Sequence, residues 1–330
     1  MKRILVTGAA GQIGSELVPA LRRRHGLEQV VASDIRDAPH LGGESGYFEH
    51  LDCTRSDQVE KIVRRYEIGT IYHLASLLSA VAEREPQRAW AVNMGGLYHV
   101  LETARRNLCS VFFPSSIAVF GPGTPKVRAP QDTILRPTTI YGVTKVAGEL
   151  LCDYYHRRYG TDTRGVRYPG LISHVAMPGG GTTDYAVDIF HHAVRHQSYC
   201  CYLDPDTSLD MVYMPDAIRA AMELMEVEGD RLRHRNAFNL TAMTVTPALL
   251  AREIQKHITS FTVSYEIDPM RQAIAESWPD SVDDSVAREE WGWMPEFDLE
   301  RMARDMLANL GKESREPESD YLHRGGPARP

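Results

Sequence analysis

The sequence predicts an α/β fold in which a doubly wound parallel sheet is followed by a smaller C-terminal substrate domain. Three observations lead to this fold class. A short apolar run, Arg3–Thr7, leads directly into glycines at positions 8, 11 and 14. Short apolar runs then alternate with amphipathic helical stretches to about residue 170, as in a parallel sheet with crossover helices. The 330 residues also exceed the size at which a single core keeps growing.

The strands and helices of the first half follow one another in regular order. Apolar runs predict strands at Arg3–Thr7, Val30–Ser33, Tyr47–Leu51, 69–74, 110–114 and Thr163–Arg167. Amphipathic patterns predict helices from the glycine segment to His25, over 86–107 and over 139–159. This alternation ends at Tyr168-Pro-Gly170, where glycine, proline and threonine become frequent, so we expect a second domain to begin there.

The glycine segment indicates a dinucleotide site. At these spacings the backbone can turn sharply, approach a pyrophosphate and let the following helix pack on the strand. The helix N-terminus adds unpaired N–H groups and positive potential, which favour an anion. The residues expected to line the pyrophosphate are Gly8, Gly11, Gln12, Ile13 and Gly14.

Asp34 marks the end of the second strand, twenty residues after Gly14. Its carboxylate would accept hydrogen bonds from the adenosine ribose hydroxyls, with Ile35 beside it. Because a carboxylate repels a 2′-phosphate, NAD is the expected cofactor. Arg36 lies close enough to leave NADP open.

Two other segments should touch the same cofactor. Asp52 and Cys53 follow the third strand and could contact the adenine. Ligands of open α/β sheets bind outside the carboxyl ends of the strands. We therefore expect the end of the fourth strand to lie along the cofactor with Leu74, Ala75 and Ser76.

These patterns predict a division into domains. We expect a nucleotide-binding Rossmann domain over residues 1–170, with a returning segment at about 208–241. The substrate-binding domain would combine residues 171–207 and 242–310. Residues 311–330 carry charges, prolines and glycines without periodicity, so a disordered tail is predicted there.

Tyr141 and Lys145 are four residues apart in a predicted helix, so their side chains share one face within a turn. A cation beside a phenol favours phenolate and lowers the tyrosine pKa toward the working pH. The pair would then make Tyr141 a base. Such pairs also occur by chance on helix surfaces, and the nucleotide site is what favours a functional interpretation here.

Composition argues against several other functions. A net charge of −7 and a pI near 6.0 provide no basic face for nucleic acid. The five cysteines form no C-x-x-C pattern, and the adjacent His191 and His192 lack partners at ligand spacing, so no metal is expected. No apolar run reaches eighteen residues and the first strand begins two residues after Met1, so neither a membrane span nor a signal peptide is expected. We expect a cytoplasmic protein, or a mitochondrial-matrix protein if a presequence was removed.

One set of residues in the first 170 positions forms a single pattern: the glycine triplet, Asp34, Asn93, Ser115, Ser116, Tyr141 and Lys145. This pattern resembles the extended short-chain dehydrogenase/reductase family. Within that family the chain is similar to the L-threonine 3-dehydrogenases as far as about residue 310. This second resemblance rests on Leu77–Ala80, Pro178–Tyr185, Ala273–Pro279 and Asp283–Trp293.

The resemblance implies a reaction, oxidation of the 3-hydroxyl of L-threonine by NAD to 2-amino-3-oxobutyrate. It implies that Tyr141 is the base, and that Lys145 lowers the Tyr141 pKa and holds the nicotinamide ribose. Ser116 would hydrogen-bond the reacting oxygen. Asn93 would support this shell by spanning backbone groups between helix and strand. The residues expected to flank the nicotinamide are Tyr168, Gly170 and Ile172.

The substrate is a zwitterion, so its carboxylate needs partners. The segment around Gly181 and Thr182 could form a nest of backbone N–H groups plus a hydroxyl, and Ser79 could add a donor. Trp278 could cover the substrate methyl group and exclude water. From the residues alone, the glycine run could equally be a flexible linker and Trp278 a core residue.

We expect a homodimer, because the helices predicted at 86–107 and 139–159 carry apolar residues on more than one side and relatives pair these helices across a two-fold axis. The residues concerned are Leu97, Val100, Leu101, Leu150, Leu151 and Tyr154. Two other functions stay open. A nucleotide-sugar epimerase would use the same NAD site, although Tyr168 is followed by Pro-Gly-Leu-Ile where those epimerases usually supply an asparagine. A catalytically silent NAD-sensing protein would not need Tyr141 and Lys145 together.

Overall fold

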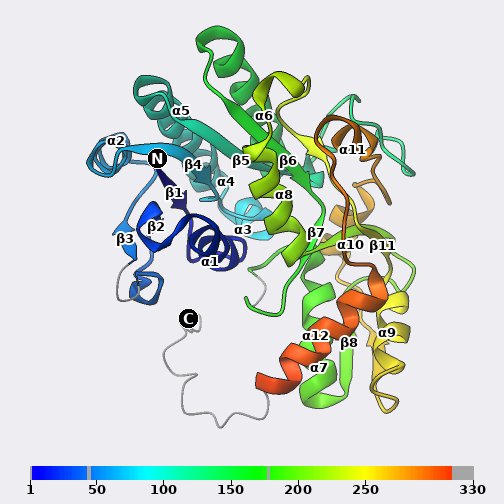
Figure 1. Cartoon of the computed structure of the whole chain (residues 1–330). Coiled ribbons are helices and arrows are strands. Elements are labelled where there is room, and N and C mark those ends of the chain that lie inside the picture. Colours follow the sequence, from blue (N-terminus) through cyan, green and yellow to red (C-terminus); the bar gives the residue numbers. More distant parts are fainter. Residues whose placement is uncertain (1, 43–45, 177–178, 314–330) are drawn as a thin grey trace.

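The computed structural model describes residues 2–42, 46–176 and 179–313. Its largest sheet has seven parallel strands in the order β10-β6-β5-β4-β1-β2-β3 (Figure 1). Their bounds are β1 Arg3–Thr7, β2 Val30–Asp34, β3 Tyr47–His50, β4 Ile68–His73, β5 Ser110–Ser116, β6 Thr163–Tyr168 and β10 Phe238–Asn239. The chain runs from β1 outward to β3 and then continues on the other side of β1 with β4. This reversal confirms the doubly wound sheet, and ligands of such sheets bind outside the carboxyl ends of the strands where the order reverses, here β1 and β4.

Helices cover both faces of this sheet because its strands are apolar on both sides. In β1, Ile4 and Val6 share a core with α1 (Gly14–His25) and α8 (Met214–Glu226). The intervening Leu5 belongs to the core of the opposite face. The helices of that face are α2 (Ser56–Arg65), α5 (Gly96–Asn107) and α6 (Ile140–Tyr159).

The helix predicted over 86–107 is interrupted. It consists of α4 (Pro86–Trp90), a π-helical turn over Ala91–Gly95, and α5. The dimer prediction also needs a correction, because three of its residues, Leu97, Val100 and Leu101, are fully buried against the sheet. Leu150 and Tyr154 do remain exposed, at 64% and 51%.

The remaining elements form the smaller part of the molecule. Strand β9 (Leu209–Tyr213) lies between β7 (Gly170–Ile172), which is parallel to it, and β11 (Met243–Val245), which is antiparallel. Strands β8 (Ser198–Cys201) and β12 (Thr262–Tyr265) form a parallel pair. The other helices are α3 Ser79–Arg84, α7 Tyr185–His196, α9 Pro247–Gln255, α10 Pro269–Glu276, α11 Ser285–Trp291 and α12 Leu299–Glu313.

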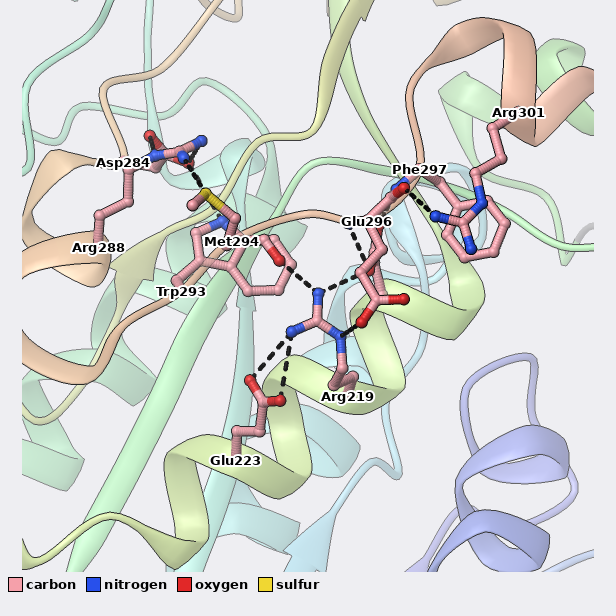
Figure 2. Close-up of polar contacts among 10 residues, drawn as sticks. Arg219, Glu223, Asp284, Arg288, Trp293, Met294, Glu296, Phe297 and Arg301 are labelled. Atoms are coloured by element: carbon pink, nitrogen blue, oxygen red, sulfur yellow. Dashed lines mark hydrogen bonds and ion pairs between the residues drawn. The ribbon is translucent and has the colours of Figure 1, made fainter.

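A polar cluster attaches the segment after α11 to α8, as Figure 2 shows around Arg219. The buried carboxylate of Asp216 accepts hydrogen bonds from the backbone N–H groups of Glu296 and Phe297. Arg219 forms an ion pair with Asp216 at 2.7 Å and lies 5.3 Å from the ring centroid of Trp293. The cluster therefore joins a helix on the large sheet to the C-terminal segment.

We propose the division predicted above, residues 1–170 with 208–241 and residues 171–207 with 242–310, because α8 packs on the large sheet and β10 is one of its strands. Helix α12 extends to Glu313, so the predicted tail begins at least three residues too early; residues 314–330 lie outside the described part. No helix in the described ranges is long and apolar enough to cross a membrane.

Candidate active site

The glycine segment lies at the carboxyl end of β1, as predicted. Gly8 has φ of +70°, and a Cβ atom there would lie 2.7 Å from the backbone N of Ala75. A Cβ at Gly14 would lie 2.5 Å from the Gly8 carbonyl oxygen. Gln12 and Ile13 lead into α1, whose N-cap has no side-chain hydrogen bond. Only glycine fits these two positions, and the uncapped helix end favours an anion.

Asp34 is the last residue of β2 and is buried. Its Oδ2 accepts from the Ala10 N–H at 3.0 Å, so the carboxylate faces the glycine segment. Its Oδ1 accepts from the Arg36 backbone N–H at 2.9 Å and from Arg36 Nε at 3.3 Å. Each carboxylate oxygen has more than one acceptor position, so hydroxyl donors can still bind. Ile35 points outward and is 59% exposed.

The loop after β3 is held by local hydrogen bonds. Asp52 Oδ1 accepts from the backbone N–H and the hydroxyl of Thr54, which commits this carboxylate to the turn. The Cys53 thiol is buried near Asp34, and burial raises its pKa to about 12. A contact of Asp52 or Cys53 with adenine would therefore use the backbone or the neutral thiol.

Asn93 connects the loop after β4 to helix α6. Its Oδ1 accepts from the Leu77 N–H at 2.8 Å and from the Ser76 hydroxyl at 3.2 Å. Its Nδ2 donates to the Leu77 carbonyl and to Thr144 Oγ1, both at 3.2 Å. Asn93 lies in the π-helical turn, and such turns are frequent at functional sites. Asn93 thus binds both backbone groups of Leu77 in the loop after β4, whereas its contact with helix α6 is to the Thr144 side chain and not to the backbone.

Tyr141 and Lys145 lie in the first turns of α6, which Thr139 caps by accepting from the Gly142 N–H. Lys145 Nζ donates to the Pro114 carbonyl at 2.7 Å and lies 5.4 Å from the centroid of the Tyr141 ring. Ser116, expected just past a strand, is the last residue of β5; its hydroxyl accepts from the Ala118 N–H at 3.2 Å and lies near enough to the Tyr141 phenol to lower the Tyr141 pKa. The structure therefore brings the three predicted catalytic residues together.

The pKa of Tyr141 does not follow the prediction. Burial raises the pKa of Tyr141 to about 12, and the nearby Ser116 hydroxyl acts in the opposite direction. Burial also lowers the pKa of Lys145 to about 8. Lys145 is not among the causes that shift the Tyr141 pKa, and its ammonium group donates to the Pro114 carbonyl.

The segment that begins at β6 is more deeply packed than expected. The Tyr168 hydroxyl donates to the Ala217 carbonyl at 2.7 Å, and the ring lies in the core between the sheet and α8. Ile172 is fully buried, and Gly170 pairs with Met211 of β9. The Tyr168 hydroxyl and the Ile172 side chain are thus directed into the protein, and a cofactor contact here would involve the backbone.

The glycine run is already hydrogen-bonded within the chain. The N–H groups of Gly180 and Gly181 donate to Asp184 Oδ2 at 2.8 and 2.7 Å. This contact caps a short 3₁₀ helix, Thr182–Asp184. The nest expected for a substrate carboxylate therefore holds an internal carboxylate. In contrast, Thr182 Oγ1 is buried and has no hydrogen-bond partner in the described part of the chain.

The other predicted substrate residues lie in buried surroundings. Ser79 is buried at the start of α3. A Cβ at Gly179 would contact Leu78 at 3.1 Å, so the glycine run adjoins the Ser79 segment. Trp278 is 5% exposed and belongs to the apolar cluster on which the Tyr141 ring packs. The two interpretations of Trp278 thus overlap, because it is a core residue of the cluster beside the site.

Sequence reasoning missed several residues that support this site. Thr144 donates to the Tyr141 carbonyl and accepts from Asn93; its position between Tyr141 and Lys145 was the available signal. His73, at the end of β4, is buried and contacts the Thr7 hydroxyl at 2.9 Å. Burial lowers the pKa of His73 to about 3, so its ring is neutral. The role of Asp184 could not be predicted, because the sequence around it does not show which N–H groups its carboxylate contacts.

Comparison with known families identifies the chain. The model of the NAD dependent epimerase/dehydratase family matches residues 4–240. The chain belongs to this family. NAD is its cofactor. The residues described above fit NAD, because Gly8 and Gly14 have no side chain, the N-terminus of α1 has no side-chain cap, and the Asp34 carboxylate faces the glycine segment.

Three individual relatives match this chain over nearly its whole length. An uncharacterised epimerase/dehydratase of Staphylococcus saprophyticus is 51% identical over 96% of this chain and 99% of its own length. The crystal structure of L-threonine dehydrogenase from Clostridium difficile is 52% identical, with a TM-score of 0.92 over 95% of this chain and 98% of that one. The holo form of a GalE-like L-threonine dehydrogenase from Cupriavidus necator is 51% identical, with a TM-score of 0.90 over 93% and 99%. Within the NAD dependent epimerase/dehydratase family the chain is therefore similar to proteins named as L-threonine dehydrogenases and to uncharacterised epimerase/dehydratases.

Proposed function

We propose that this family member oxidises the 3-hydroxyl of L-threonine with NAD and forms 2-amino-3-oxobutyrate. One observation carries the proposal: Ser116 at the end of β5 lies near Tyr141, with Lys145 one turn further along α6, at the carboxyl end of the large sheet. The likeness to the Clostridium difficile L-threonine dehydrogenase supports the choice of substrate.

In this proposal Tyr141 removes the proton of the substrate hydroxyl as C3 loses a hydride. When bound, NAD supplies the hydride acceptor and a cationic ring. Because burial raises the Tyr141 pKa to about 12, the phenol needs positive charge nearby to ionise near neutral pH. The Ser116 hydroxyl has one O–H donor, which favours the phenolate in the free protein and would donate to the substrate oxygen once threonine is bound.

NAD would be held by three parts of the chain. The glycine segment and the N-terminus of α1 would bind the pyrophosphate, and Asp34 would bind the adenosine ribose. Lys145 uses one N–H on Pro114 and has two left for the nicotinamide ribose. The Asn93 bridge would keep the loop of Leu74, Ala75 and Ser76 against the cofactor.

The substrate carboxylate is assigned to the hydroxyls of Thr182 and Ser79. The buried, unpartnered Thr182 Oγ1 supports this, because an unsatisfied buried hydroxyl costs free energy that a ligand can recover. The Gly181 N–H can join only when Asp184 turns away. Trp278 would lie on the methyl side of the substrate.

We also propose a homodimer formed through α5 and α6. Tyr98, Leu150 and Tyr154 are each at least half exposed on these helices. An exposed apolar and aromatic face of this kind is typical of an interface.

One set of incubations tests the function against its alternatives. Purified protein with NAD and L-threonine should produce a steady increase in NADH absorbance. Interconversion of UDP-sugars without net NADH would instead establish an epimerase, the kind of enzyme represented by a Thermotoga maritima structure that is only 22% identical. NAD binding without turnover of either substrate would establish a sensor.

A further inference from the structure

A lysine from the segment between two candidate catalytic residues binds the turn that carries Trp278. Lys126 lies between Ser116 and Tyr141 in the sequence, so both ends of its segment are anchored at the site. Its Nζ donates to the Trp278 carbonyl at 2.7 Å and also to the Glu276 carbonyl, 150 residues away in the sequence. Lys126 therefore connects the segment of the proposed base to a residue proposed to cover the substrate.

The two carbonyls that Lys126 binds lie where helix α10 ends. Glu276 is the last residue of α10, and Trp278 follows two residues later. The last carbonyls of a helix have no partner within the helix, and a lysine ammonium group both accepts this role and matches the negative helix end. The Trp278 N–H donates to the Ala275 carbonyl at 3.1 Å, which closes the turn from inside. Lys126 supplies the hydrogen bonds that hold the turn from outside.

The two segments are also paired through their backbones, independently of the Lys126 side chain. The Lys126 carbonyl accepts from the Asp280 N–H at 2.7 Å. Ala129 and Val282 then form a parallel bridge. Removal of the ammonium group should therefore leave the segments paired and release only the turn at Trp278.

The indole of Trp278 belongs to an apolar cluster that reaches the candidate site. Trp278 is 5% exposed, and the cluster includes Ile117 and Ala118, which directly follow Ser116. The Tyr141 ring packs against the same cluster. A displaced Trp278 turn would therefore change the apolar surroundings of the phenol that is proposed to act on the substrate.

We propose that Lys126 is a positioning residue that holds Trp278 on the methyl side of the substrate and so sets a preference for L-threonine over L-serine. The inference rests on the proposed function and deepens it, because it assigns the substrate preference to one contact. L-serine lacks the methyl group, and one such group in an apolar pocket changes kcat/KM by about 10- to 200-fold. A turn that is free to move should lose part of this discrimination, while the hydroxyl chemistry common to both substrates is retained.

The test compares Lys126→Met, which has no donor, with Lys126→Arg, which keeps charged N–H donors. In Lys126→Met the ratio of kcat/KM for L-threonine to kcat/KM for L-serine should fall at least about fivefold, mainly through the loss with threonine. Lys126→Arg should keep the ratio near its wild-type value. Amide hydrogen exchange at Ser277 and Trp278 should become faster in Lys126→Met, with the Kd of NAD unchanged.

Lys256→Met is the matched control, because Lys256 is an exposed lysine that pairs with the Glu253 side chain in α9. It should change neither the ratio nor the exchange. A wild-type ratio in Lys126→Met would overturn the inference, as would equal losses with both substrates or a loss of the same size in Lys126→Arg. If the wild type oxidises neither amino acid, the proposed function fails and the preference fails with it; unchanged exchange in Lys126→Met would instead show that Lys126 does not hold the turn.

Discussion

Replacing Glu16 by glutamine should stabilise the protein at pH 8 and not at pH 4.5. Glu16 lies in the first turn of α1, beside the glycine segment, and the Ser173 hydroxyl donates to its Oε1. Burial raises the pKa of Glu16 to about 7, and Ser173 opposes this only in part. The folded protein therefore favours the protonated form of Glu16 over the charged carboxylate.

The size and sign of the effect follow from linkage. A folded-state pKa of about 7, against 4.5 for an ordinary glutamate, means that the folded chain binds the extra proton between these two pH values. The unfolding free energy then falls as pH rises from about 4.5 to 7, by about 3 kcal/mol in total. Glutamine keeps an acceptor for the Ser173 hydroxyl and carries no charge. The unfolding free energy of the Glu16→Gln variant should therefore not decrease in this way as pH rises.

The assay is thermal unfolding of both proteins, without NAD, from pH 4.5 to 8. The difference in Tm between variant and wild type should grow by about 6 °C across this range, taking about 2 °C per kcal/mol for a long chain. Glu28→Gln, which removes an exposed glutamate, is the control and should give a constant difference. A Glu16→Gln difference that is equally constant would refute the reasoning.

Three further predictions concern the cofactor, the substrate and the assembly. With Asp34 at the ribose, kcat/KM should be much higher with NAD than with NADP, and equal efficiencies would show that Arg36 overcomes the carboxylate. Thr182→Ala should raise KM for L-threonine at least about tenfold, because a hydrogen bond to a charged group is worth about 1.5 to 3 kcal/mol; Thr183→Ala is the matched control, and an unchanged KM would remove Thr182 from the site. Light scattering at micromolar concentration should report a dimer that Tyr154→Glu disrupts, whereas a wild-type species of only 37.1 kDa would contradict the assembly.

The large sheet could be predicted because its strands are continuous apolar runs. Arg3–Thr7 and Val30–Asp34 are found at the expected residues, and the glycine segment indicated which edge binds the cofactor. Strand β10 could not be predicted, since two residues show no periodicity and their pairing with β6 depends on distant contacts. The π-helical turn could not be predicted either, because Asn93 contacts Leu77 and Thr144 only in the folded chain.

The placement of the candidate catalytic residues relative to one another could be predicted, whereas their pKa values could not. Helical spacing brings Tyr141 and Lys145 to one face, and the end of β5 brings Ser116 to the phenol. Spacing says nothing about where the Lys145 ammonium is directed or how deeply Tyr141 is buried. For the same reason the occupation of the glycine nest by Asp184 is visible only in three dimensions.

The most direct test of the central claim follows the hydrogen from C3 of threonine. L-threonine carrying deuterium at C3 is mixed with NAD and the protein, and deuterium in the reduced cofactor is measured by mass spectrometry over time. We expect deuterium transfer by the wild type, and transfer slower by about 100- to 10,000-fold in a folded, NAD-binding Tyr141→Phe variant that lacks the general base. Reduced cofactor without deuterium, no transfer at all, or a variant faster than about a tenth of the wild-type rate would contradict the account.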